Sequence, residues 1–276
     1  MRCISWNIGK NYKILEKQLK IIEDTNPEIL ALQEVTEKTF LEIEKKIKSK
    51  FKFIYFSLNS INKKSLLIGP RKLGVLTASN FKLIPRPDDE FDVPWRERIL
   101  NLDVFTGKDK FIFYNSYIPP GSSNGWIKIE TLEGIFKGLN KKKEKPIILC
   151  GDFNIPQAED SKGNIITFAQ KIKLKGKPKL KKSFRGGSGS RWDLAEKNLF
   201  KNLKSQSIED GYRRFHGFKK NDYSFEIIRK GKIISRRRFD HFFVSAEIEI
   251  NNIEYLHNYR LQKLSDHSPI QMDFTI

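Results

Sequence analysis

The 276-residue chain has 38% hydrophobic residues and only two cysteines, which allows a sizeable core and excludes a disulfide framework or a metal site built on sulfur. Its net charge of +19 and pI near 9.7 favour a polyanionic partner, nucleic acid or an anionic membrane surface, although solvated lysine-rich faces alone would give the same balance. No apolar run reaches the ~18–20 residues of a spanning helix and no signal peptide opens the chain, so we expect a soluble, cytoplasmic protein, or a nuclear one in a eukaryote.

The N-terminal part of the chain alternates between helical and extended hydrophobic patterns. Apolar residues three to four positions apart predict a helix over Lys13–Glu23, which the Asn26-Pro27 pair ends. A second helix is predicted to begin after Thr36, whose hydroxyl can cap it. Short runs rich in apolar, β-branched and aromatic residues predict strands between them. The strands expected here are Met1–Ile8, Glu28–Gln33 and Phe51–Ser57.

The rest of the chain predicts one further helix, over Trp126–Leu139, among several strands. No internal repeat and no linker divides the sequence, so we expect a single α/β domain over residues 1–276. The strands expected here are Phe111–Ile118, Pro146–Cys150, Tyr223–Ile228, Phe239–Ser245, Ile248–Tyr255 and Pro269–Ile276.

A basic insertion at about Lys171–Arg191 is the least structured stretch that the sequence predicts. Lysines occupy every second position at its start, and in an extended chain such residues point the same way. We favour a loop that follows phosphates, and the alternative is a solvated insertion. The lysines concerned are Lys171, Lys173, Lys175, Lys177 and Lys179.

Six short polar motifs follow or interrupt the apolar runs, at the strand ends where α/β proteins assemble their active sites. A carboxylate at the end of a buried strand is costly unless a partner or a metal ion balances it. Asp152, directly after a buried run, is the clearest case. The motifs are Ser5-Trp6-Asn7, Leu32-Gln33-Glu34, Asn115-Ser116-Tyr117, Gly151-Asp152-Phe153-Asn154, Arg238-Phe239-Asp240 and Ser265-Asp266-His267.

The residue types in these motifs indicate a metal-assisted hydrolysis. Their carboxylate and amide oxygens are hard ligands that suit Mg²⁺ or Mn²⁺. Only four histidines occur in the chain, and His267 alone lies among acids in such a motif, which argues against a histidine-rich zinc site. One histidine remains for electrostatic or acid–base work. The oxygen donors are Glu34, Asp152, Asp240 and Asp266, with Asn7 and Asn154.

In this order, the motifs resemble those of the endonuclease/exonuclease/phosphatase superfamily, whose fold is that of deoxyribonuclease I. The resemblance runs from residue 5 to about residue 270, nearly the whole chain. It implies an α/β four-layer sandwich, in which two mixed β-sheets pack face to face with helices on the outside. For the metal site, it implies that Glu34 is the principal Mg²⁺ ligand and that Asn7 and Asp266 assist around the ion.

The same resemblance implies the catalytic roles. Asp152 orients and deprotonates the attacking water, and Asn154 holds that water or the phosphate. Asp240 pairs with His267 and orients its ring toward the scissile phosphate. Tyr117 donates a hydrogen bond to the phosphate or the leaving oxygen, although its apolar neighbours also allow a core tyrosine. Together these residues imply a one-step hydrolysis without a covalent intermediate.

Within the superfamily, Tyr117 followed by Pro119 resembles the exonuclease III and apurinic-site endonuclease branch. The sequence departs from that branch at Pro120, where a polar amide is usual, and at Arg237, where an aromatic residue often helps to close an abasic pocket. We therefore expect a DNA endonuclease or exonuclease of the repair type, with abasic cleavage weakly favoured. The residues expected to grip the substrate are Arg236, Arg237, Arg238, Lys173, Lys175 and Lys177.

Two other classes of function remain as alternatives. One is a phosphodiesterase or phosphatase that acts on RNA, a DNA-end adduct or a phospholipid. The other is a non-catalytic nucleic-acid-binding module, although Glu34, Asp152 and His267 are all present. We expect DNA as the partner, no membrane association, and a monomer.

Overall fold

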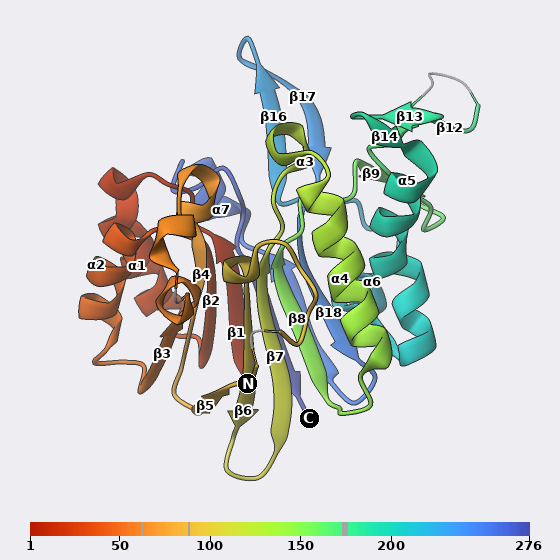
Figure 1. Ribbon diagram of the computed structural model, residues 1–276. Helices are drawn as coiled ribbons and strands as arrows, with labels where there is room; N and C mark the ends of the chain where they lie inside the picture. The colour runs from red at the N-terminus through yellow and green to blue at the C-terminus, as the bar shows by residue number, and fades with distance from the viewer. Residues whose placement is uncertain (62, 88, 173–175) are drawn as a thin grey trace.

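The computed structural model describes residues 1–61, 63–87, 89–172 and 176–276, and it contains two six-stranded sheets (Figure 1). In both sheets, one pair of neighbouring strands is parallel and the other pairs are antiparallel, so both are mixed. The first sheet has the order β19 (Glu249–Tyr255), β20 (Ile270–Thr275), β1 (Arg2–Asn7), β2 (Ile29–Val35), β4 (Gly74–Ser79) and β3 (Phe53–Phe56). The second has the order β15 (Ile208–Asp210), β18 (Asp240–Ser245), β8 (Ile147–Asp152), β7 (Lys110–Tyr117), β6 (Ile99–Phe105) and β5 (Lys82–Pro85).

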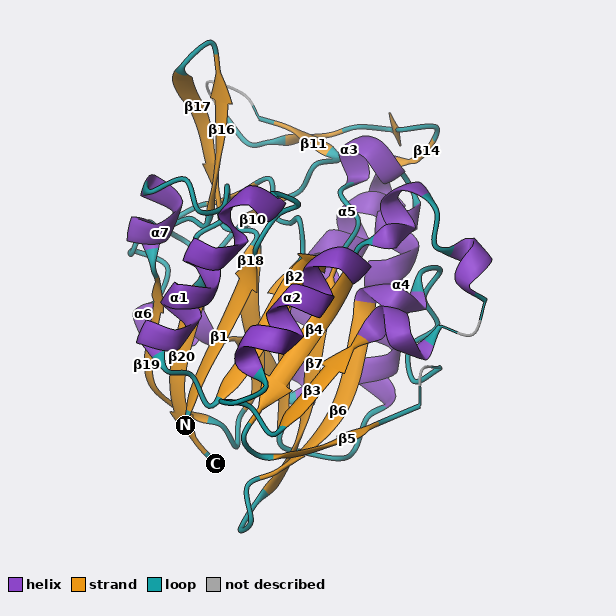
Figure 2. Cartoon of the chain, turned by 90° about the vertical axis from the view of Figure 1, so that its left-hand side faces the viewer, coloured by secondary structure: helices purple, strands orange, loops and turns teal. Residues whose placement is uncertain are grey.

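The two sheets pack face to face, and helices cover their outer faces (Figures 1 and 2). A central apolar cluster joins the inner faces, for example through Cys3 and Met272 of the first sheet and Cys150 and Phe242 of the second. Two outer clusters join the helices to the sheets. The expected α/β four-layer sandwich is therefore confirmed. Helices α1 (Leu15–Thr25) and α2 (Glu37–Ile47) cover the first sheet, and α4 (Ile127–Lys141) and α5 (Gly189–Lys197) cover the second.

The predicted helix boundaries follow local chemistry. Thr36 caps α2, because its hydroxyl accepts from the Thr39 backbone N–H at 3.1 Å while the Thr39 hydroxyl accepts from the Thr36 N–H at 2.8 Å. Helix α1 ends at Asn26, which adopts a left-handed conformation with φ of 48° before Pro27. Helix α1 begins at Leu15 instead of Lys13, after a 3₁₀ turn. In the described part of the chain, no helix is long and apolar enough to cross a membrane.

No strand was predicted over residues 58–110, where the structure contains β4, β5, β6 and the first residue of β7. Every residue of β4 is buried, because helices cover one face and the other sheet covers the second. Such a strand shows no alternation of apolar and polar residues for a sequence pattern to detect. Helix α5 and the short helices α3 (Gly121–Asn124), α6 (Gly211–His216) and α7 (His257–Leu261) were also not predicted.

The basic insertion is more ordered than expected. It contains two small hairpins, β11 (Gln170–Lys171) with β12 (Lys179–Leu180) and β13 (Ser183–Phe184) with β14 (Gly187–Ser188), before α5 begins. Lys171 and Lys179 are cross-strand partners on antiparallel strands, so the expected row of lysines on one extended strand is wrong. Lys177 is exposed, whereas Lys173 and Lys175 lie outside the described residues.

A two-stranded ribbon, β16 (Phe225–Arg229) with β17 (Lys232–Arg237), projects beyond the sandwich in both views (Figures 1 and 2). Its second strand leads directly into β18, which begins at Asp240. The ribbon therefore rises from the end of the sandwich at which β18 starts. Among the described residues, a further pair is β9 (Ala158–Glu159) with β10 (Ile165–Ile166).

Candidate active site

Polar residues gather where five strands end or begin at one end of the sandwich. Asn7 is the last residue of β1, and Glu34 is the last but one of β2, which runs parallel to β1. Tyr117 and Asp152 end the parallel strands β7 and β8, where they are register partners. Asp240 begins the antiparallel strand β18 directly opposite Asp152. The topology thus brings residues from distant parts of the chain to the same end of the sandwich, where these strands end or begin.

Hydrogen bonds join the two sheets at this edge. The side-chain amide of Asn7 donates to Oδ2 of Asp152 at 2.9 Å and, more weakly, to Oε1 of Glu34 at 3.3 Å. The hydroxyl of Tyr117 donates to the same Glu34 oxygen at 2.7 Å. Because Asn7 and Glu34 belong to one sheet and Asp152 and Tyr117 to the other, the site exists only when the sandwich is closed.

Glu34 occupies an irregular position in its strand. Its φ is 61°, in the left-handed region that non-glycine residues rarely adopt, and the pairing of β2 with β4 shifts register between Gln33 and Val35. Such a backbone costs about 1–3 kcal/mol and is typical of functional positions. The bulge breaks the alternation of the strand, so Glu34 is half-buried at the site while both neighbours are buried in the fold.

Asp240 and His267 form the hydrogen-bonded pair that the sequence predicted. Nδ1 of His267 donates to Oδ2 of Asp240 at 2.7 Å, and both side chains are buried. The other ring nitrogen, Nε2, lies 3.9 Å from Oδ2 of Asp152. The imidazole is therefore held between two carboxylates.

This arrangement raises the pKa values of His267 and Asp152. Burial alone lowers the pKa of His267, but the charges of Asp240 and Asp152 outweigh it and raise that pKa to about 10. Burial raises the pKa of Asp152 to about 7, against the opposing charge of His267. His267 is thus a cation at neutral pH, beside a carboxylate that can exchange a proton in the same range.

Asn154 and Asp266 complete the predicted set. The backbone N–H of Asn154 donates to Oδ1 of Asp152 at 2.9 Å, and its side-chain amide donates to Oδ2 of Asp152 at 3.2 Å. Asp266 is exposed, and its Oδ1 lies about 4 Å from the position that a Cβ on Gly9 would occupy. Gly9 in turn donates its backbone N–H to Oδ1 of Asn7, so Asp266 lies beside the loop that follows β1.

Two groups of side chains are candidates for holding a cation. Asp152, Asp240 and His267 each offer a ligand atom within 4.8 Å of the others. However, a protonated imidazole is not a ligand, and Nδ1 of His267 is already bonded to Asp240. Glu34 and Asp266 are the other candidates, because among the described residues neither Oε2 of Glu34 nor the carboxylate of Asp266 has a hydrogen-bond partner. These free hard oxygens suit a divalent cation.

Arg98 is a site residue that the sequence analysis missed. Its side chain is 1% exposed, and its guanidinium carbon lies 4.3 Å from the centre of the Tyr117 ring. Nη2 donates to the carbonyl of Pro70 at 2.6 Å, while Nε and Nη1 have no partner within the described ranges. Burial lowers the pKa of Arg98, and burial raises that of Tyr117 well above its usual value. The only sequence signal was a charged run directly before the apolar strand β6.

The three consecutive arginines have three different environments. Arg236 is exposed and pairs with Glu226 at 3.0 Å. Arg237 is half-buried and lines a cavity that Asn154 also lines. Arg238 is buried and pairs with Glu159 at 2.7 Å and with Asp210, so the expectation that it grips substrate is corrected. Its guanidinium serves the fold, because two buried carboxylates already occupy its donors.

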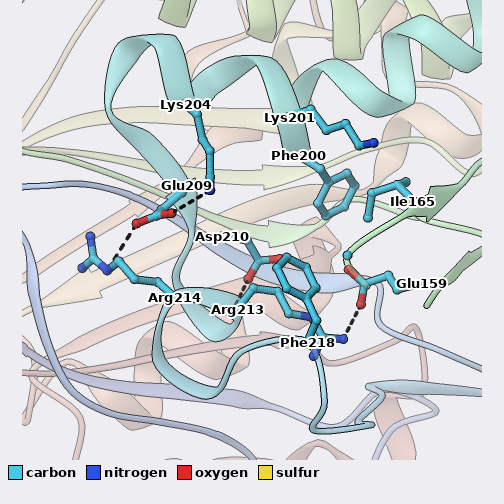
Figure 3. A pocket seen from close by; sticks show the side chains of 11 residues that line it. Glu159, Ile165, Phe200, Lys201, Lys204, Glu209, Asp210, Arg213, Arg214 and Phe218 are labelled. Atoms are coloured by element: carbon cyan, nitrogen blue, oxygen red, sulfur yellow. Dashed lines mark hydrogen bonds and ion pairs between the residues drawn. The ribbon is translucent and has the colours of Figure 1, made fainter. Parts of the chain in front are cut away.

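A cavity of about 110 Å³ is lined by Glu159, Phe200, Asp210 and Arg213, among other residues, and by none of the predicted catalytic residues (Figure 3). Figure 3 shows Arg213 paired with Glu159, and Glu209 between Arg214 and Lys204. His241 is fully buried and bonds to Asp210 at 3.2 Å and to the Ile155 carbonyl at 2.8 Å. This network supports the loop after β8, so His241 has a structural position.

The fold and the strand-end carboxylates define a class of hydrolytic phosphodiesterases. Residues 4–267 match the Endonuclease/Exonuclease/phosphatase family, and the chain belongs to that family. A DNA-(apurinic or apyrimidinic site) endonuclease from Dictyostelium discoideum is 28% identical over 288 residues, which cover 98% of this chain and 69% of the relative. The protein is accordingly an enzyme of this family.

Two solved structures illustrate the fold. An AP endonuclease from Archaeoglobus fulgidus aligns over the whole of both chains with a TM-score of 0.69 and 18% identity. D. rerio TDP2, complexed with a single-strand DNA product, aligns over 100% of this chain and 99% of its own, with a TM-score of 0.65 and 13% identity. At these identities, the two structures support the fold and leave the particular activity open.

Proposed function

We propose that this protein is a Mg²⁺-dependent phosphodiesterase that hydrolyses DNA, of the exonuclease III and apurinic-site endonuclease type. The observation that carries the proposal is the position of Asn7, whose amide contacts both Glu34 and Asp152. It places a carboxylate with a free oxygen next to a carboxylate that can accept a proton. Hydrolysis of a phosphodiester requires both functions within a few ångströms of one phosphate.

Each residue of the site then has a role in the reaction. Asp152 accepts the proton of the attacking water, and its pKa of about 7 suits a general base near neutral pH. The Asn154 amide, bonded to Asp152, orients that water or the phosphate. The His267 cation faces the negative charge that develops on the phosphate, and Asp240 holds its ring in place. No residue forms a covalent bond to the phosphate in this scheme.

Glu34, Asn7 and Asp266 would hold the cation, with Mn²⁺ as a substitute for Mg²⁺. When bound, the ion supplies a Lewis acid that neutralises charge on the phosphoryl oxygens. Without substrate, Tyr117 orients the Glu34 carboxylate through its 2.7 Å hydrogen bond, and its single hydroxyl proton turns to the leaving oxygen when the phosphate is in place. All of these residues belong to one chain, so a monomer is sufficient for activity.

The net charge of +19 supports a polyanionic substrate such as a nucleic acid. The Dictyostelium relative, which is named for action on DNA, supports DNA among the nucleic acids. Arg236 and Lys177, both exposed, are proposed to contact backbone phosphates, together with Lys173 and Lys175 of the same basic insertion. Each such contact should lower the slope of log affinity against log salt by about 0.7–0.9.

The test is a cleavage assay on labelled intact, nicked and abasic duplexes, single-stranded DNA, and RNA, with Mg²⁺ or with EDTA. We expect hydrolysis of DNA that EDTA abolishes and that Asp152→Asn reduces by about 10²–10⁴-fold, because the general base is lost. Asp160→Asn, which changes an exposed carboxylate in the loop after β9, is the matched control. Cleavage that persists in EDTA, or none on any DNA, would overturn the proposal, and preferential cleavage of RNA would reassign the substrate.

A further inference from the structure

A cavity of about 390 Å³ opens beside Asn154, at the foot of the β16–β17 ribbon. A single water molecule needs only about 10–15 Å³ of such space, so the cavity has room for a group much larger than water. Four aromatic side chains line it, together with two guanidinium groups from separate segments. These residues are Phe168, Trp192, Phe225, Phe239, Arg185 and Arg237.

The aromatic wall of this cavity begins at the catalytic histidine. The ring of Phe225 lies 4.8 Å from that of His267, and the two residues also form a backbone bridge. Phe225 stacks on Phe239 with ring centres 5.4 Å apart and an angle of 25° between the planes. A nucleotide whose phosphate lies at His267 would therefore have aromatic rings directly beside it.

Arg237 carries a charge that the fold does not balance. Its neighbours Arg236 and Arg238 pair with carboxylates, but in the described part of the chain no carboxylate lies within ion-pair distance of Arg237. Its guanidinium carbon lies 4.8 Å from the centre of the Phe168 ring, and its buried Nε has no hydrogen-bond partner among the residues described. A half-buried cation with unused donors is costly unless a ligand completes it.

The other cations of the cavity do not fill the same role. Lys128 is buried and pairs with Glu196 at 2.8 Å, so its charge is compensated. Arg185 is exposed at the rim and donates only to the carbonyl of Ser122 within the described ranges. The cavity thus offers aromatic rings, on which a flat ring can stack, and the uncompensated guanidinium of Arg237, which can bind a phosphate. A ligand that combines a flat ring with a phosphate, such as a nucleotide, fits both.

We propose that this cavity binds a complete, unpaired nucleotide next to the scissile phosphate, with its base on Phe225 and Phe239 and its outer phosphate on Arg237. The proposal rests on the proposed function, because it names the form of DNA that the site accepts. Aromatic rings stack on every base and provide a sequence-tolerant platform. A base that stacks here is not in a duplex, so the enzyme selects single-stranded, frayed or extruded nucleotides. A sugar without a base offers these rings nothing to stack on.

The first experiment compares cleavage of single-stranded DNA, a duplex with one mismatched nucleotide, a fully paired duplex, and a duplex with a tetrahydrofuran abasic analogue. We expect single-stranded and mismatched DNA to be cut faster than both the paired and the abasic-analogue duplexes. Arg237→Gln should lower kcat/KM on the unpaired substrates by about tenfold, because a charge-assisted hydrogen bond is lost. Arg237→Lys should recover part of that loss. Arg2→Gln removes the same charge at the opposite end of β1 from Asn7, outside this cavity, and should change kcat/KM less than twofold.

The second experiment measures binding without cleavage. In EDTA, an oligonucleotide with 2-aminopurine at the unpaired position should lose fluorescence on binding, because the base stacks on the aromatic wall. Phe225→Leu should weaken this quenching, and affinity for the unpaired oligonucleotide should fall about 5- to 100-fold.

The outcomes separate this inference from the proposed function. If no DNA is cleaved with Mg²⁺, the proposed function fails. If DNA is cleaved but the abasic-analogue duplex is preferred, or if Arg237→Gln behaves like Arg2→Gln, the nucleotide pocket fails while the function stands. Unchanged 2-aminopurine fluorescence on binding would likewise overturn the pocket.

Discussion

Oδ2 of Asp240 accepts a hydrogen bond from Nδ1 of His267 at 2.7 Å, across 27 residues of sequence. The backbone of Asp240 is fixed as well, because its N–H donates to the Ser224 hydroxyl and its carbonyl accepts from the Tyr255 hydroxyl at 2.6 Å. The imidazole therefore has one orientation, with Nε2 directed toward Asp152. Asp240 therefore orients the His267 ring and keeps it protonated, whereas burial alone would lower its pKa.

Asp240→Asn should separate the charge of this residue from its shape. The amide can still accept from Nδ1, but the loss of the negative charge lowers the pKa of His267 and weakens its hold on the developing phosphate charge. We expect kcat to fall by about 10²–10⁴-fold with little change in melting temperature. Steady-state kinetics with circular dichroism would measure both, with Asp160→Asn as the control. A loss of less than about threefold would contradict a catalytic role for the pair.

Glu34→Gln should impair metal binding and leave the fold intact. Glutamine can still accept the hydrogen bond of Tyr117, but it lacks the charge that a divalent cation requires. We expect the Mg²⁺ concentration for half-maximal activity to rise by about 10- to 100-fold. Glu37→Gln, an exposed residue at the start of α2, should leave the titration unchanged. Identical Mg²⁺ titration curves for Glu34→Gln and the wild-type protein would remove Glu34 from the metal site.

Arg98→Met should reduce activity without a matching loss of stability. Arg98 supports the face of the Tyr117 ring, yet two of its nitrogens are buried without partners in the described part of the chain. We expect kcat to fall by about tenfold. The free energy of unfolding should fall by less than about 1 kcal/mol, because the loss of one charge-assisted hydrogen bond to Pro70 is offset by the removal of a buried cation with two unpaired nitrogens. Arg71→Met is the contrast, because it leaves the buried Glu97 unpaired and should cost about 3 kcal/mol. Equal destabilisation by both changes would indicate that Arg98 serves only the fold.

Arg238→Met should destabilise the protein, most clearly at neutral pH. Burial alone would raise the pKa of Asp210 and of Glu159, but Arg238 and its neighbours hold both values below their usual range. The stability that these carboxylates contribute is therefore complete above their unfolded pKa values of about 3.9 and 4.3, and it is lost progressively as the pH falls from there through their lower folded pKa values. Without Arg238, we expect a loss of about 3–5 kcal/mol at pH 7 and a smaller difference from the wild type at acidic pH.

Urea unfolding at pH 7 and at about pH 2 would measure this difference, with Arg236→Met as the matched control. Glu226 retains Arg260 as a partner when Arg236 is removed, so that change should cost less than about 0.5 kcal/mol. If the two methionine variants unfold alike at pH 7, the buried network does not contribute as inferred.

Much of the fold and most residues of the candidate site could be predicted from the sequence, through local patterns and through the order of its motifs. Thr36 caps a helix, and Asp152 and Asn154 follow a buried strand, because both features depend on neighbours within a few residues. The ordered motifs also predicted the Asp240–His267 contact. Strand β4 and its neighbours could not be predicted in this way, because burial on both faces removes the alternation that marks a strand.

The sequence by itself determined which chemical groups the protein brings to its active site, since those groups follow strands whose patterns are local. Only the tertiary structure decided how identical residues divide their work. Arg236, Arg237 and Arg238 are adjacent in the chain, but their roles depend on Glu226, an open cavity, and the Glu159–Asp210 pair respectively. Those partners come from other segments, and the environment of a charge is set by what packs around it, whatever its neighbours in sequence.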